Sequence, residues 1–127
     1  MNNHNYQVVY VEDNYHNRRI VHKILGAYGY HVHEASDGRT GLQLIQDMHP
    51  DLVLLDISLP GIDGIEVVGR LKASSEYRDI PVVALTASAM VGDRERFLGA
   101  GCDDYLSKPV AALDLIRKVK AYLPVDD

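Results

Sequence analysis

The sequence of 127 residues has little of what stabilises secreted or membrane-spanning proteins. Its single cysteine, Cys102, has no second cysteine to form an internal disulfide, which indicates a reducing compartment. No apolar run approaches the ~20 residues that a transmembrane helix needs. The first residues, MNNHNYQ, lack the charged and apolar regions of a signal peptide. These absences predict a cytoplasmic protein without membrane insertion.

The chain also has fewer basic than acidic residues. The chain has 13 Lys and Arg against 18 Asp and Glu, so its formal net charge is −5. This acidic balance argues against nucleic acid as a direct partner. The hydrophobic share of 46% and the charged share of 24% are ordinary for a globular domain. The length suits one domain, so we expect residues 1–127 to form a single unit.

Short apolar runs alternate with longer amphipathic stretches along the chain. Strands are expected over residues 6–11, 31–35, 51–56, 80–86 and 103–107. Helices are expected after a cap at Asn14, over 41–48, from Asp63-Gly64 onward, over 89–99 and over 110–123. This fivefold βα alternation predicts an α/β fold, a doubly wound (βα)5 parallel sheet with helices on both faces. The first, third and fourth strands are the most apolar and should be central, which favours the order 2-1-3-4-5 with right-handed crossovers.

Helical spacing also predicts which side chains lie along one side of each helix. In the first helix the apolar stripe comprises Ile20, Val21, Ile24, Leu25 and Tyr28. In the last helix the corresponding residues are Leu113, Ile116 and Val119.

Polar residues follow the strands that should be neighbours in the sheet. Glu12 and Asp13 follow the first strand, and Asp56 ends the third. Because ligands of open parallel sheets bind at the carboxyl ends of the strands, these three carboxylates are expected in one cleft. Carboxylates this close repel one another unless a cation lies between them. An all-oxygen ligand set with open positions suits a hard divalent ion, Mg²⁺ above all.

Two further residues add a hydroxyl and an ammonium group, which phosphoryl transfer can use. Thr86 ends the fourth strand with a hydroxyl, and Lys108 follows the fifth strand with an ammonium. A transferring phosphoryl group needs its oxygens neutralised and a nucleophile held in line. Asp56 can be that nucleophile and form an acyl phosphate. Each residue alone is an ordinary loop residue or helix cap, but the combination is far more specific.

These residues lie in segments that resemble the receiver domain of CheY-like response regulators, from two-component signalling. The matching segments are VVYVEDN (8–14), DLVLLDISLPGIDG (51–64), IPVVALTA (80–87) and GAGCDDYLSKP (99–109). The resemblance extends from about Tyr6 to Leu123, and it implies the CheY/flavodoxin-like sheet already expected. Within the family, the sequences of these segments are most similar to those of DivK-like single-domain regulators. It is also similar to receivers attached to hybrid histidine kinases.

The resemblance implies a role for each of the acidic residues. Asp56 corresponds to the phosphoacceptor and is also a ligand of Mg²⁺ or Mn²⁺. Asp13 corresponds to a direct metal ligand, and Glu12 to one that acts through water. The backbone carbonyl of Ser58 corresponds to a third protein ligand.

The resemblance also implies how phosphorylation is bound and transmitted. Lys108 binds a phosphoryl oxygen, and the Lys108-Pro109 peptide bond is expected to be cis. Thr86 corresponds to the switch hydroxyl and Tyr105 to the switch aromatic residue. Together they bias a surface formed by the fourth helix, the fifth strand and the fifth helix. One departure from the family pattern is Leu59, which stands where methionine is frequent.

The implied partners are proteins. A histidine kinase or a histidine phosphotransfer protein donates the phosphoryl group, and a downstream protein receives the signal; a phosphorylation-dependent dimer is an open alternative. The receiver assists its own phosphorylation and dephosphorylation, and no independent substrate turnover is expected. No output domain follows Leu123, and the start at Met1 favours a single-domain regulator over a receiver excised from a hybrid histidine kinase.

Three other classes fit the residues less well. A haloacid-dehalogenase-type phosphohydrolase also uses an aspartate nucleophile and Mg²⁺, but it needs a second aspartate where this chain has Ser58. A flavodoxin-like FMN carrier needs a phosphate-binding loop after the first strand, where Glu12 and Asp13 repel phosphate. A pseudo-receiver scaffold usually lacks Asp56 or Lys108, and both are present.

Overall fold

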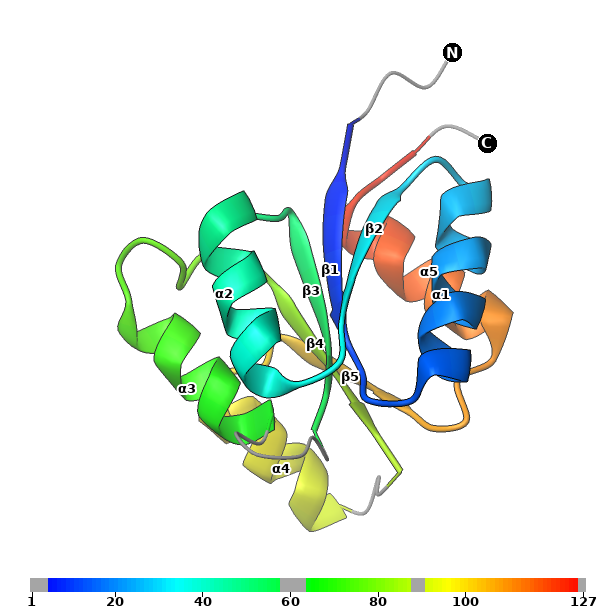
Figure 1. Ribbon diagram of the computed structural model, residues 1–127. Helices are drawn as coiled ribbons and strands as arrows, with labels where there is room; N and C mark the ends of the chain where they lie inside the picture. The colour runs from blue at the N-terminus through cyan, green and yellow to red at the C-terminus, as the bar shows by residue number, and fades with distance from the viewer. Residues whose placement is uncertain (1–4, 58–63, 88–90, 126–127) are drawn as a thin grey trace.

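In a computed structural model of the chain, which describes residues 5–57, 64–87 and 91–125, strands and helices alternate (Figure 1). The strands are β1 (Gln7–Val11), β2 (His31–Ala35), β3 (Leu52–Asp56), β4 (Val82–Thr86) and β5 (Asp104–Ser107). The helices are α1 (Tyr15–Ala27), α2 (Gly38–Met48), α3 (Gly64–Ala73), α4 (Val91–Ala100) and α5 (Ala112–Tyr122). None of the helices in these described ranges is long and apolar enough to cross a membrane.

The strands form one parallel sheet in the order β2-β1-β3-β4-β5, which confirms the predicted fold. Helices α1 and α5 lie on one face of the sheet, and α2, α3 and α4 lie on the other (Figure 1). Val11 pairs with Leu55 across β1 and β3, so the segments that follow these two strands emerge side by side. The sheet order therefore brings Glu12 next to Asp56.

Apolar side chains on the two faces of the sheet form two core layers. Successive residues of a strand point to opposite faces, so Val53 and Leu55 pack towards α2, α3 and α4, whereas Leu52 and Leu54 pack towards α1 and α5. Every residue of β3 and β4 is buried. A strand buried on both faces needs a continuous apolar run, which is why these two strands read as the most apolar.

The buried sides of α1 and α5 comprise fewer residues than the apolar stripes. Ile20 and Tyr28 of α1 are 47% and 40% exposed, and Leu113 of α5 is 57% exposed. In α5 the residues that face the sheet are Leu115 and Val119, four positions apart. A helix turns about 100° per residue, so residues three apart drift around it by roughly 60° at each step and leave the core face.

Helix α2 begins three residues earlier than predicted because Asp37 caps it. The Asp37 side chain accepts a hydrogen bond from the backbone N–H of Thr40 at 2.7 Å. This bond satisfies a donor that the first turn of a helix leaves unpaired. The helix therefore starts at Gly38 rather than at Gly41.

The Asp37 cap should contribute to stability in a pH-dependent way. The Thr40 N–H holds the pKa of the Asp37 carboxyl below its usual value. A pKa lowered by folding means that the contribution is present above the pKa of the unfolded chain, and that it is lost as the pH falls through the folded-state pKa. Asp37→Asn keeps an acceptor but does not titrate. We expect the stability of the wild type relative to Asp37→Asn, measured by urea unfolding, to fall on acidification; a difference that is constant with pH would contradict this role.

Candidate functional site

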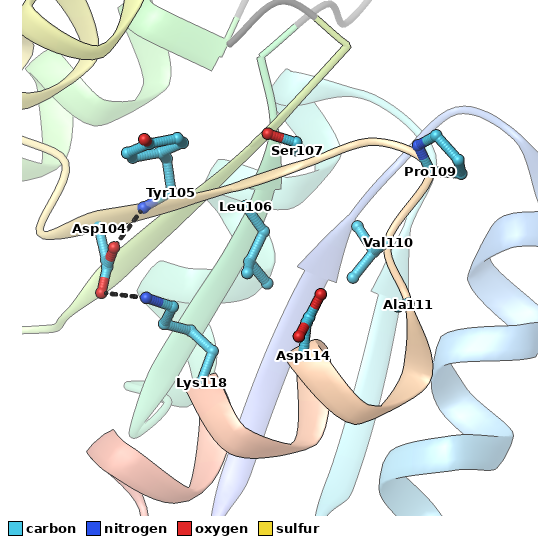
Figure 2. Close-up of a pocket in the computed structure, with 9 residues that line it drawn as sticks. All are labelled: Asp104, Tyr105, Leu106, Ser107, Pro109, Val110, Ala111, Asp114 and Lys118. Atoms are coloured by element: carbon cyan, nitrogen blue, oxygen red, sulfur yellow. Dashed lines mark hydrogen bonds and ion pairs between the residues drawn. The ribbon is translucent and has the colours of Figure 1, made fainter.

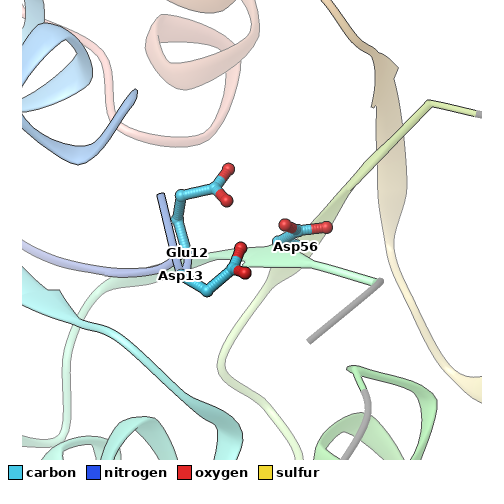
Figure 3. A group of neighbouring side chains, drawn as sticks. All are labelled: Glu12, Asp13 and Asp56. Atoms are coloured by element: carbon cyan, nitrogen blue, oxygen red, sulfur yellow. The ribbon is translucent and has the colours of Figure 1, made fainter. Parts of the chain in front are cut away.

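Three carboxylates converge at the carboxyl ends of β1 and β3. Glu12 and Asp13 directly follow β1, and Asp56 is the last residue of β3. One carboxylate oxygen of each lies within 4.8 Å of the others (Figure 3). Glu12 and Asp56 are only 1% and 3% exposed, whereas Asp13 is exposed. The structure thus brings together the three acidic residues that the sequence predicts for one cleft.

Lys108 faces two of these carboxylates. Its Nζ lies 2.8 Å from Glu12 Oε1 and 2.9 Å from Asp56 Oδ2. The backbone N–H of Lys108 donates to the carbonyl oxygen of Thr86 at 2.7 Å, and the Lys108-Pro109 peptide bond is cis. The hydrogen bond holds the segment after β5 against the end of β4, and the ammonium contacts residues at the ends of β3 and β1.

Burial and mutual contacts shift the pKa values of the paired groups. Burial raises the pKa of Glu12, and the neighbouring Asp56 carboxylate raises it further, while the bond from Lys108 opposes the shift. For Lys108, burial lowers the pKa, but its hydrogen bonds to Glu12 and Asp56 outweigh burial and raise it overall. The ammonium is therefore held in its charged form.

The acidic cluster fits a divalent metal ion. Three carboxylates face one ammonium, which leaves excess negative charge in a largely buried site. Oxygen ligands of this kind are those that Mg²⁺ and Mn²⁺ prefer, and the exposed Asp13 leaves one side of the cluster accessible. Glu12, Asp13 and Asp56 can therefore hold such an ion. The predicted carbonyl ligand, Ser58, lies outside the described residues.

The two predicted switch residues lie on β4 and β5. Thr86 is the last residue of β4 and is 3% exposed. Tyr105 is half-buried on β5 and packs against the core layer that contains Phe97 and Cys102. Thr86 thus borders the acidic cluster, and Tyr105 lies on the side of the sheet that α4 covers.

Two contacts of the site were missed from the sequence. The Tyr10 hydroxyl donates to Glu12 Oε1 at 3.2 Å, and burial together with the Glu12 charge raises the pKa of Tyr10. Strand alternation, which puts residues two apart on one face, could have indicated this pair. Arg18 donates from Nη1 to the carbonyl oxygens of Glu12 and Asp13. No pattern indicates that contact, because an arginine in the first turn of a helix usually faces water.

A groove of about 460 Å³ opens beside the acidic cluster. Glu12 and Lys108 lie at its polar side, and Ile20 and Val21 of α1 line its apolar side. The remaining lining residues are Tyr10, Asn17, Ala87, Pro109 and Val110. The polar cluster therefore borders an apolar surface that is partly open to solvent.

Comparison with known proteins shows the family of the chain. Residues 8–120 match the response regulator receiver domain family. The chain is 43% identical over 116 residues to the polar-differentiation response regulator DivK of Brucella ovis, covering 91% of this chain and 94% of DivK.

Solved structures of receiver proteins also match the chain. The receiver domain of a sensor histidine kinase from Pseudomonas aeruginosa, in which a magnesium ion is coordinated in the active site cleft, matches with 33% identity and a TM-score of 0.86, covering 94% of this chain and 98% of that one. The chemotaxis protein CheY4 of Vibrio cholerae matches with 26% identity and a TM-score of 0.88, covering 94% and 99%. The chain belongs to the response regulator receiver domain family of two-component signalling and is similar to DivK.

Proposed function

We propose that the chain accepts a phosphoryl group on Asp56 from the phosphohistidine of a histidine kinase or of a histidine phosphotransfer protein. The observation that carries this proposal is the position of Asp56, at the end of the fully buried strand β3 and 2.9 Å from the Lys108 ammonium. A carboxylate oxygen of Asp56 attacks phosphorus, the N–P bond breaks, and the imidazole nitrogen keeps the electron pair and takes up a proton. The product is an acyl phosphate on Asp56.

The residues around Asp56 supply the chemistry of this transfer. A bound Mg²⁺ would offset the negative charges of the carboxylates and of the phosphoryl oxygens. Asp13 and Asp56 would hold it directly and Glu12 through water, and the magnesium ion in the similar Pseudomonas aeruginosa receiver supports this assignment. Lys108 would move one of its two carboxylate contacts to a phosphoryl oxygen. In the hydrolysis of the acyl phosphate, water attacks phosphorus, the O–P bond to Asp56 breaks, inorganic phosphate leaves and the Asp56 carboxylate is restored, so no separate substrate is turned over.

The phosphorylated state would be transmitted through Thr86 and Tyr105. The new phosphoryl oxygens would attract the Thr86 hydroxyl by a charge-assisted hydrogen bond, and Tyr105 would move into the space that Thr86 leaves. Tyr105 also lines a groove of about 490 Å³ along β5 and the start of α5 (Figure 2). Asp104 and Lys118 form an ion pair of 2.8 Å in this groove. The groove supports a downstream protein target on the α4-β5-α5 surface, or a second copy of the chain.

The apolar groove beside Lys108 supports a protein as the phosphoryl donor, because its exposed Ile20 can be covered by a docking helix. We further propose that residues 8–120, which match the family, act as one receiver domain, and that the single cysteine, Cys102, indicates the cytoplasm. A receiver carried by a hybrid histidine kinase is the alternative, since the Pseudomonas aeruginosa structure is the receiver of a sensor histidine kinase.

The proposed function can be tested with a small phosphodonor. Incubation with acetyl phosphate and Mg²⁺ is expected to add one phosphoryl group per chain, seen by intact mass spectrometry. Borohydride reduction followed by peptide mapping should locate it at Asp56. Chelation of Mg²⁺ should prevent the addition, because the repulsion among the carboxylates is then uncompensated. A modification that maps to a histidine or a serine, or none at all with Mg²⁺ present, would overturn the proposal.

A further inference from the structure

Arg18, in the first turn of α1, reaches back to the loop that carries the acidic residues. Its Nη1 donates to the carbonyl oxygen of Glu12 at 2.7 Å and to that of Asp13 at 3.1 Å. The first carbonyl belongs to the peptide group before Asp13, and the second belongs to the peptide group after it. A single guanidinium nitrogen thus holds both peptide planes that flank Asp13.

The guanidinium of Arg18 is itself held in place. Its Nε lies 3.5 Å from Glu34 Oε1, and its central carbon lies 5.5 Å from the centroid of the Tyr15 ring. The side chain is only 14% exposed. A planar guanidinium fixed on one edge presents its other donors in a defined direction, which a flexible ammonium does not. The contacts with Glu34 and Tyr15 therefore help to hold the guanidinium against the loop carbonyls.

Asp13 depends on its backbone more than the other two carboxylates do. Glu12 and Asp56 are buried and in contact with Lys108, whereas the Asp13 side chain is exposed. An exposed side chain receives little orientation from packing, so its direction follows from the peptide planes on either side. We infer that Arg18 is a positioning residue that aims Asp13 at the metal site, an inference that rests on the proposed function.

The positive charge of Arg18 disfavours metal binding, whereas its positioning of Asp13 favours metal binding. A guanidinium this close to the cluster repels a divalent ion, so its loss through charge alone would strengthen metal binding. Its loss as a positioning residue would weaken metal binding, because groups that orient metal ligands typically contribute about 10- to 100-fold in affinity. The direction of the change therefore separates the two effects.

Arg19 offers a matched control. Its Nη1 contacts the same Glu34 carboxylate, at 2.7 Å from Oε2, and Arg19 is half exposed. Arg19→Ala removes the same charge from the same partner but leaves the hydrogen bonds to the loop carbonyls intact.

The test is titration of the metal-free protein with Mg²⁺ by isothermal calorimetry. Arg18→Ala is expected to weaken Mg²⁺ binding by about 10-fold or more, and Arg19→Ala to leave it unchanged or slightly tighter. Affinity in Arg18→Ala equal to or higher than in the wild type would overturn the inference. If the wild type itself binds no Mg²⁺, the proposed function fails instead, so the two failures are distinguishable.

Two further measurements exclude a merely structural role. Arg18→Lys keeps the charge and loses the planar donor geometry, and it is expected to bind Mg²⁺ more weakly than the wild type even if Arg18→Ala does not fold. Wild-type affinity in Arg18→Lys would overturn the inference. In the folded variants, the rate of phosphorylation by acetyl phosphate should recover at saturating Mg²⁺. A rate that stays low at saturation would mean that Arg18 acts on another step and would also overturn it.

Discussion

Asp56→Asn is expected to abolish phosphorylation by acetyl phosphate and by any phosphohistidine donor. Asparagine has nearly the same shape, so the strand and its core neighbours are retained. Its amide is not nucleophilic and cannot form an acyl phosphate. The expected result is no added phosphoryl group in intact mass spectrometry under conditions that modify the wild type fully.

The control for Asp56→Asn lies just before the same strand. Asp51 precedes β3, and its Oδ2 accepts a hydrogen bond from the backbone N–H of Gln7 at 2.7 Å. Asp51→Asn keeps this acceptor and removes the same charge at the end of the strand opposite the site. It is expected to be phosphorylated like the wild type. Stoichiometric modification of Asp56→Asn would show that another residue is the acceptor, and loss of modification in both variants would point to a general effect of charge.

Gly64→Ala is expected to destabilise the fold because α3 begins in close contact with the end of β3. A Cβ on Gly64 would lie 2.7 Å from the Cα of Ile57 and 2.8 Å from the carbonyl oxygen of Asp56. Both neighbours are backbone atoms, so the start of the helix or the end of the strand must shift. Overpacking of this kind typically costs about 1–3 kcal/mol of unfolding free energy, measurable by urea denaturation.

Gly69→Ala, in the same helix, should have the opposite effect. Among the described residues, no atom other than those of the two chain neighbours and the helix's own backbone lies within 4 Å of a Cβ at Gly69, and the residue is exposed. Alanine in a helix interior is favoured over glycine by about 0.5–1 kcal/mol, so this variant should be more stable than the wild type. Destabilisation of Gly69→Ala to the same extent as Gly64→Ala would show that replacing either glycine of α3 by alanine is unfavourable, and the close approach at Gly64 would not be the cause.

The sheet was predictable from the sequence because burial on both faces leaves a distinct pattern. The apolar runs before Asp56 and before Thr86 are the two fully buried strands β3 and β4. The carboxyl-end rule then brought Glu12, Asp13 and Asp56 together without any knowledge of side-chain positions. The convergence of these residues depends on sheet order, which the alternation of elements determines.

Features that depend on local geometry were less predictable. Strand β4 begins at Val82 rather than at Ile80, since Pro81 has no N–H to donate to a neighbouring strand. The contact of Arg18 with the loop carbonyls depends on the path of the loop and on the anchor at Glu34, which is distant in sequence. Leu113 belongs to the predicted stripe of the last helix but is exposed, because residues three apart resemble a stripe over one turn and diverge over two.

The burial of the strands differs across the sheet, and this has a consequence for how the molecule fluctuates. Strand β3 is entirely buried, whereas the residues of β5 are half-buried or exposed and β5 lies at the edge. Segments with few buried contacts open at a lower free-energy cost than the core does. Asp56, the proposed nucleophile, therefore lies on the part of the chain that opens least, and β5, a part of the proposed output surface, opens more readily. A receiver built this way can rearrange its output surface while the residues around Asp56 keep their positions.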